Sequence, residues 1–69
     1  MYKTYHYEIP ASQYDGVVSH EFDTIEECVE ECKRECTELG VDYDRRDVML
    51  FLTDADGVEE CTEEGELAG

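Results

Sequence analysis

Basic residues are scarce in this chain: five lysines and arginines stand against twenty aspartates and glutamates, giving a formal net charge of −15. A small soluble domain usually carries a net charge of magnitude ~2–8. Direct binding to nucleic acid is therefore disfavoured, because phosphate contacts need lysine and arginine to displace counterions. The same argument favours a partner protein with a basic surface.

Long apolar runs are also missing. No stretch approaches the ~20 consecutive apolar residues that a membrane-spanning helix requires. Residues 1–10 alternate between polar and apolar side chains, unlike the apolar centre of a signal peptide. With 41% hydrophobic residues, the chain of 69 residues is expected to form a single domain over 1–69 around one small core.

Residues 2–9 have the alternation of a half-buried strand. Tyr5, Tyr7 and Ile9 share one face of this predicted strand, since side chains two positions apart point the same way. The opposite face carries Tyr2, Thr4, His6 and Glu8. Residues 10–16 contain the single proline together with serine, aspartate and glycine, so they predict a loop.

A second strand is predicted over residues 17–22, with Val18, His20 and Phe22 on one face. Only the loop separates it from the first strand. Because consecutive strands usually pair, we expect the two to form an antiparallel hairpin.

A helix is predicted to begin after Thr24. Thr24 and Glu27 have the spacing of a capping box, in which the glutamate side chain bonds back to the amide of the cap. Gly40 is the glycine expected just past the C-terminus of a helix. Between these two signals the apolar residues recur at helical spacing and form one continuous stripe. The stripe consists of Ile25, Cys28, Val29, Cys32, Cys36 and Leu39.

Residues 48–53 are an unbroken apolar run of strand length, suited to the centre of a sheet. Asp56-Gly57 then predicts a two-residue hairpin turn. The register of this turn pairs Ala55 with Val58, Leu52 with Cys61 and Phe51 with Thr62. The fourth strand, residues 58–62, becomes a charged edge that resists aggregation, and residues 63–69 are expected to fray as an acidic tail.

The order strand-strand-helix-strand-strand predicts an α+β fold: a small antiparallel sheet (ββαββ) with one amphipathic helix packed on one face. The residues placed toward the helix are Val48, Leu50, Leu52 and Cys61. Met49 and Phe51 then face away from it, with no second element to cover them. Uncovered apolar side chains on a very acidic domain suggest an interaction surface.

Of the four cysteines, Cys28, Cys32 and Cys36 lie on the helix stripe. Free cysteine behaves as a small buried hydrophobe, so packing in the core is the favoured interpretation. A metal site is disfavoured, because cysteines at i, i+4 and i+8 of one helix with a lone Cys61 make a poor tetrahedron. A disulfide between Cys61 and Cys28 or Cys32 is geometrically possible, but cytosolic thiols stay reduced.

Other candidate sites have weaker signals. Residues 53–60 place acidic side chains around a turn, but a calcium loop of the EF-hand type needs an acid at the position of Leu52, so an acidic hairpin turn is favoured. His6 and His20 lie on neighbouring predicted strands, without a serine or cysteine spaced to act as nucleophile. We interpret them as structural. No glycine-rich phosphate loop is present, and nothing indicates an enzyme or a cofactor.

The outward side of the predicted helix is strongly acidic. It carries Glu26, Glu27, Glu30, Glu31, Glu35 and Glu38, relieved only by Lys33 and Arg34. Like charges at i, i+4 destabilise a helix slightly, and Glu30 with Arg34 is the favourable pair at that spacing. Carboxylates ~6 Å apart along an axis form a linear array broadly like a phosphate backbone. A merely solvated surface is the alternative.

Small, strongly acidic single domains of this kind resemble phage-encoded DNA-mimic inhibitors, among which anti-CRISPR proteins are often of this length. Residues 47–55 are also similar to a strand of the phage uracil-DNA glycosylase inhibitor. The matching positions are Val48, Met49, Leu50, Asp54 and Ala55. In that family an apolar pocket captures a leucine of the enzyme, and acidic residues imitate DNA. The resemblance implies that Met49 belongs to such a pocket; Phe51 stands where the family has leucine, and the family's helices precede its sheet.

These observations favour a non-enzymatic inhibitor that occupies the basic nucleic-acid-binding surface of a host protein, foremost an anti-CRISPR protein acting on a CRISPR effector subunit. The alternatives are an inhibitor of uracil-DNA glycosylase or another DNA-processing enzyme, and an acidic, halophile-type structural or homodimeric domain. We expect no cofactor, metal or membrane contact, and a cytoplasmic location, in the host cell if a phage encodes the chain. The residues predicted to bind the partner are Glu26, Glu27, Glu30, Glu31, Glu35, Glu38, Met49, Phe51, Asp54, Asp56, Glu59 and Glu60.

Overall fold

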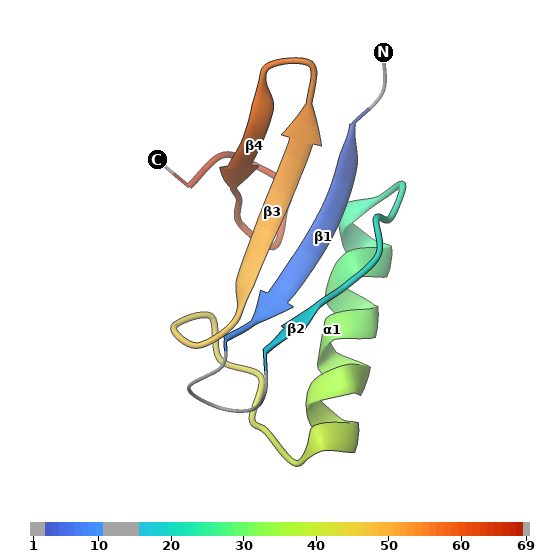
Figure 1. Ribbon diagram of the computed structural model, residues 1–69, viewed down its shortest axis with the longest axis vertical. Helices are drawn as coiled ribbons and strands as arrows, with labels where there is room; N and C mark the ends of the chain where they lie inside the picture. Colours follow the sequence, from blue (N-terminus) through green and yellow to red (C-terminus); the bar gives the residue numbers. More distant parts are fainter. Residues whose placement is uncertain (1–2, 11–15, 69) are drawn as a thin grey trace.

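A computed structural model of the chain describes residues 3–10 and 16–68. The elements are, in order, β1 (Thr4–Ile9), β2 (Val17–Val18), α1 (Ile25–Leu39), β3 (Met49–Asp54) and β4 (Gly57–Glu60). The strands form one four-stranded antiparallel sheet in the order β2-β1-β3-β4, and α1 packs against β1 (Figure 1). The predicted α+β fold with the order ββαββ is confirmed.

β1 and β3 form the centre of the sheet, and their pairing fixes its two faces. Tyr5 pairs with Leu52, and Tyr7 pairs with Leu50. Tyr7, Leu50 and Leu52 are buried, so this side of both strands faces α1, as the alternation predicts. Residue 2, part of the predicted strand, lies outside the described residues.

The second strand differs from the prediction. β2 has only two residues, and Val18 is 65% exposed whereas Phe22 is buried. Glu8 of β1 pairs with Val18, and Tyr5 of β1 forms a bridge with Phe22. The segment from Val18 to Phe22 is therefore one residue longer than the segment from Tyr5 to Glu8 that it faces. The extra residue acts as a β-bulge and reverses the alternation. Val18 and Phe22 therefore lie on opposite faces.

Ser19 satisfies the backbone of β1 at this irregularity. Its amide donates to the Tyr7 carbonyl at 3.0 Å, and its Oγ accepts from the Tyr7 amide at 2.9 Å. A side chain thus replaces one bond of the regular ladder, a common use of serine where regular structure is interrupted.

α1 begins and ends where the sequence predicts. Thr24 is the N-cap, and its side chain accepts a hydrogen bond from the Glu27 amide at 3.2 Å. The reciprocal bond of the predicted capping box, from the Glu27 carboxylate to the Thr24 amide, is not among the hydrogen bonds of residues 3–10 and 16–68. Gly40 ends the helix in the left-handed conformation, at φ 76°, which glycine adopts without strain.

The β3–β4 hairpin turns one residue earlier than predicted. Ala55 and Asp56 form the two-residue turn, and Asp54 pairs with Gly57. Asp54 Oδ1 accepts from the Asp56 amide at 2.8 Å, a local bond that favours a turn at this point. Gly57, at φ 124°, becomes the first residue of β4.

The register of this hairpin consequently differs from the prediction by two residues. The predicted pairs Ala55–Val58, Leu52–Cys61 and Phe51–Thr62 are wrong. The observed pairs are Thr53–Val58, Leu52–Glu59 and Phe51–Glu60. Because side chains alternate with a period of two, a shift by two leaves each of them on its predicted face. Val48, Leu50, Leu52 and Cys61 are all buried.

The C-terminal turn (residues 62–68) folds back on β4, where the sequence predicts fraying of residues 63–69. The Ala68 amide donates to the carbonyl of Glu60, the last residue of β4, at 3.1 Å. Main-chain hydrogen bonds of this kind do not require an apolar periodicity, so the residue pattern does not predict them. The final residue lies outside the described residues.

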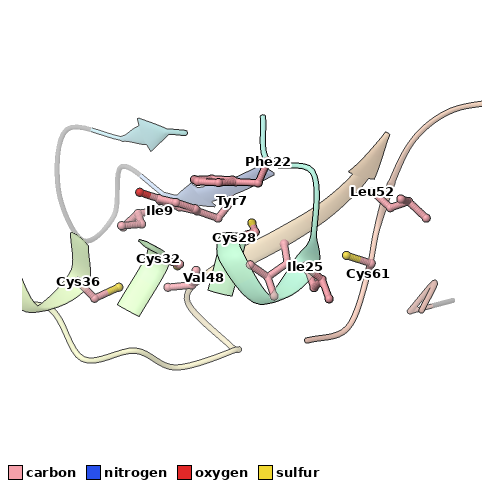
Figure 2. Packing of buried hydrophobic residues seen from close by; sticks show 11 residues of the cluster. Tyr7, Ile9, Phe22, Ile25, Cys28, Cys32, Cys36, Val48, Leu52 and Cys61 are labelled. Atoms are coloured by element: carbon pink, nitrogen blue, oxygen red, sulfur yellow. The ribbon is translucent and has the colours of Figure 1, made fainter. Parts of the chain in front are cut away.

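The core lies between the sheet and α1 (Figure 2). Its buried side chains are Tyr7, Ile9, Phe22, Ile25, Cys28, Cys32, Cys36, Val48, Leu50, Leu52 and Cys61. The rings of Tyr7 and Phe22 stack with their centroids 6.2 Å apart. α1 thus contributes mainly thiols, and the sheet contributes the larger apolar groups.

Candidate functional site

The glutamates of α1 lie on its solvent side, because the buried stripe of the helix faces the sheet. Glu26, Glu27, Glu30 and Glu38 are exposed, whereas Glu31 and Glu35 are partly buried. The helix has 15 residues and is therefore about 22 Å long. Its exposed glutamates extend from Glu26 to Glu38, about 18 Å along the axis, with Lys33 and Arg34 between Glu30 and Glu38.

Few of these charges are neutralised within the chain. Arg34 pairs with Glu31 at i, i+3, so the predicted pair of Arg34 with Glu30 is wrong. Either spacing brings side chains together on a helix, and the sequence cannot decide between them. The amine of Lys33 lies 5.2 Å from the centroid of the Tyr43 ring. In the described part of the chain, the exposed glutamates of α1 have no ion pair.

Glu35 connects the helix to β1. The Tyr7 hydroxyl donates to Glu35 Oε1 across 3.5 Å. Burial, and then the charge of Glu35, raises the pKa of Tyr7 above its ordinary value of 10.0. Tyr7 is therefore a protonated donor at neutral pH, and Glu35 is partly engaged within the domain.

The acidic residues of the β3–β4 hairpin are divided between the two sides of the sheet. Glu59 pairs with buried Leu52 and shares its side, whereas Glu60 points the other way. Asp54 and Asp56 lie at the turn and are joined by the bond described above. Within residues 3–10 and 16–68, no three histidine, cysteine, aspartate or glutamate side chains are placed to hold a metal ion.

Met49 and Phe51 face away from α1, as the sequence predicts. Both are partly buried, and the His6 ring stacks on Phe51 with centroids 4.9 Å apart and an interplanar angle of 20°. The sheet therefore lies between these two residues and the glutamates of α1. Among the predicted acidic residues that lie in strands, only Glu60 shares their side. The structure does not assemble the predicted residues into one surface.

All four cysteines are free thiols in the core. Cys28, Cys32 and Cys61 are 0% exposed and Cys36 is 1% exposed. Burial raises the pKa of Cys28 from 9.0 to about 12, and it also raises the pKa values of the other three. A protonated thiol is a poor nucleophile and a poor metal ligand. The interpretation of these cysteines as core residues is confirmed.

The histidines pack on different aromatic rings, and only His6 lies in a strand, because β2 ends at Val18 and His20 follows it outside the sheet. His6 stacks on Phe51, and the His20 ring lies 4.3 Å from the Phe22 ring, centroid to centroid. These contacts agree with the predicted structural role of both residues.

Two residues with important positions are missing from the predicted site. The guanidinium of Arg45 donates to the carbonyl of Cys61 at 2.9 Å. Glu8 lies directly opposite Met49 in the β1–β3 pairing. The alternation of β1 already groups Glu8 with His6, so this position could be found from the sequence. Arg45 could not, because both of its partners, the carbonyl groups of Val48 and Cys61, are main-chain atoms that leave no mark in the residue pattern.

No protein-family model matches the chain, and neither a curated protein nor a solved structure matches it. In the described part of the chain, no helix has the length and apolar character needed to cross a membrane.

Proposed function

We propose that the protein is a non-enzymatic inhibitor that occupies a basic nucleic-acid-binding surface of a partner by presenting the outward glutamates of α1. The observation that carries this proposal is the exposure of Glu26, Glu27, Glu30 and Glu38 without an ion pair in the described residues. The net charge of −15 adds a long-range field of the same sign.

The physical basis is competition for the same cationic side chains. Lysines and arginines that bind phosphates would also bind a row of carboxylates on a rigid helix. Attraction at a distance would speed association at low salt, and this effect would fall as salt screens the charges. The cysteines and histidines take no part, since they pack inside the domain or on its rings.

Among partner classes, we place a CRISPR effector subunit first and a DNA-processing enzyme such as uracil-DNA glycosylase second. Size and acidity favour the first class, and the similarity of residues 47–55 favours the second. Both partners would be met in the cytoplasm.

Displacement of a fluorescent oligonucleotide from such partners tests the proposal, with anisotropy as the readout. The chain should displace DNA or guide RNA at low salt and lose this ability as salt is added. The double variant Glu26→Gln, Glu30→Gln should displace less of the oligonucleotide than the original chain does at the same concentration. The matched variant Glu64→Gln, Glu66→Gln removes the same charge from exposed positions of the C-terminal turn and should act like the original chain. Displacement that is indifferent to salt and to the helix variant would contradict the proposal.

A further inference from the structure

The outer face is the side of the sheet turned away from α1. It is formed by alternate strand residues, whose neighbours along β1 and β3 are buried against the helix. These residues are Thr4, His6, Glu8, Val18, Met49, Phe51, Thr53, Val58 and Glu60. The C-terminal turn lies on the other side, where a Cβ at Gly65 would be 3.5 Å from Ile25 Cγ2 of α1. The described elements leave the outer face uncovered.

Apolar side chains extend across the middle of the outer face. Phe51 follows Met49 along β3, and Val58 of β4 pairs with the next residue on this face, Thr53. Val58 is 57% exposed. Phe51 is covered in part by the His6 ring. Neighbouring apolar groups of this kind on a very acidic chain mark a contact surface.

Carboxylates border these apolar groups. Glu8 lies directly opposite Met49, and Glu60 lies directly opposite Phe51. Directly opposed residues have Cβ atoms about 5 Å apart, so each carboxylate stands beside an apolar side chain. The strand positions of the outer face include no lysine or arginine. The strand positions of the outer face therefore combine apolar side chains with carboxylates and carry no basic side chain.

A second copy of the chain fits this face poorly. A symmetric dimer would place the face against itself and bring Glu8 and Glu60 of one copy near those of the other. Glu21, whose carboxylate accepts from the Thr4 hydroxyl at 2.8 Å, would add to the repulsion. Each copy carries a net charge of −15, so the field of the whole molecule opposes this dimer as well.

We propose that the outer face docks a partner segment in which an apolar side chain is flanked by lysine or arginine. The apolar side chain would pack on Met49 and Phe51, and the basic side chains would pair with Glu8 and Glu60. Such pairs would be charge-assisted hydrogen bonds at the edge of an apolar contact. This docking surface does not involve the glutamates of α1, so it stands even if the inhibitor function proposed above fails.

An NMR titration of the ¹⁵N-labelled chain tests this with a synthetic peptide. In the extended peptide Lys-Ser-Leu-Ser-Lys-Ser-Leu-Ser-Lys, lysine and leucine share one face. A control peptide with serine in place of leucine has the same charge. The leucine peptide should shift the amide signals of Glu8, Met49 and Phe51 and bind about tenfold more tightly than the control, because partial burial of leucine contributes to affinity.

Two variants separate the outer face from the helix. Val58→Lys puts a positive charge at an exposed position, where the fold should tolerate it. This charge repels the lysines of the leucine peptide and should lower the affinity for that peptide about tenfold. Glu26→Gln, on α1, should leave that affinity unchanged. Signal changes confined to α1, equal affinity for both peptides, or full binding by Val58→Lys would overturn the proposal. A dimer of the chain alone in sedimentation, dissolved by Phe51→Ser, would assign the face to a second copy and overturn it too.

Discussion

Arg45 joins the two ends of the β3–β4 hairpin: its Nη2 donates to the Cys61 carbonyl at 2.9 Å, and its Nη1 donates to the Val48 carbonyl. Val48 precedes β3, and Cys61 follows β4. Both residues are 0% exposed, so their carbonyl groups have little access to water. One of the few basic side chains is thus used inside the fold and does not neutralise the acidic surface.

Removing this side chain should destabilise the domain. Arg45→Ala should lower the free energy of unfolding by about 2–3 kcal/mol, because hydrogen bonds from a charged donor are strong and the freed carbonyls stay buried. Urea unfolding measures the change. Arg46→Ala is the matched control, since the Arg46 side chain is 88% exposed and its ion pair in the described part of the chain is with nearby Asp44, and such pairs contribute little. Equal effects of the two substitutions would contradict the role assigned to Arg45.

The packing role of the thiols predicts an order among substitutions at Cys61. Cys61→Ala should lower the free energy of unfolding by about 1 kcal/mol through a small cavity. Cys61→Ser should lower it by about 2–3 kcal/mol, because a hydroxyl is buried among apolar groups. Thermal unfolding followed by circular dichroism, with a reductant present, ranks the two. If serine were tolerated as well as alanine, the site would be polar or open, contrary to its 0% exposure.

Alkaline pH should unfold the protein. Burial raises the pKa of Cys28 from 9.0 to about 12 and also raises those of the other thiols and of Tyr7 and Tyr43. The unfolded chain therefore releases these protons first, so the stabilisation is complete below about pH 9 and is lost as pH rises. Each group contributes at most about 1.4 kcal/mol per pH unit. Urea midpoints measured on either side of pH 9 test this, and a flat profile would show that the thiols are accessible.

Salt separates the proposed inhibitor from a halophile-type structural domain. We expect the chain to be folded at ordinary ionic strength, with only a modest rise in Tm as KCl screens its charges. Glu30→Gln with Glu38→Gln removes repulsion of ~0.2–0.5 kcal/mol between neighbours on α1 and a negative charge in its last turn, where the helix dipole disfavours it, and should raise Tm by about 1–3 °C at low salt. A chain that folds only in molar KCl would favour the halophile-type alternative.

A hydroxyl without a partner predicts a stabilising substitution. Tyr43 Oη is buried and has no partner within hydrogen-bond distance in the described residues, although the carboxylate of Glu63 lies close enough to help raise the pKa of Tyr43. Tyr43→Phe removes this polar atom and keeps the ring beside Lys33, so it should leave the free energy of unfolding unchanged or raise it by up to about 1 kcal/mol. Tyr7→Phe is the control, because its hydroxyl bonds to Glu35. A clear loss of stability in Tyr43→Phe would mean that the hydroxyl is bonded in solution.

The helix and the faces of the central strands could be predicted because their signals are local or periodic. Thr24 and Gly40 mark the ends of α1 by their own conformations, and a period of two assigns Leu50 and Leu52 to the core. The hairpin register is different. Ala55-Asp56 and Asp56-Gly57 are both feasible turns, and a single side-chain bond from Asp54 accompanies the first.

The interruption in the second strand has no signal in the sequence. Ser19 accommodates an extra residue there by bonding to both main-chain groups of Tyr7, and nothing in the pattern of residues 17–22 distinguishes this from a regular strand. The candidate site shows the same limit. The acidic helix and the outward Met49 and Phe51 follow from periodicity, but their separation follows from the layering of the fold, which only the assembled structure displays.

The placement of α1 and the outer face on opposite sides of one sheet restricts the shape of any binding partner. A flat molecule can touch the helix or the strands, but not both. A single protein that binds both surfaces must enclose the domain from two sides. Otherwise two separate proteins bind, and this small domain is the spacer between them.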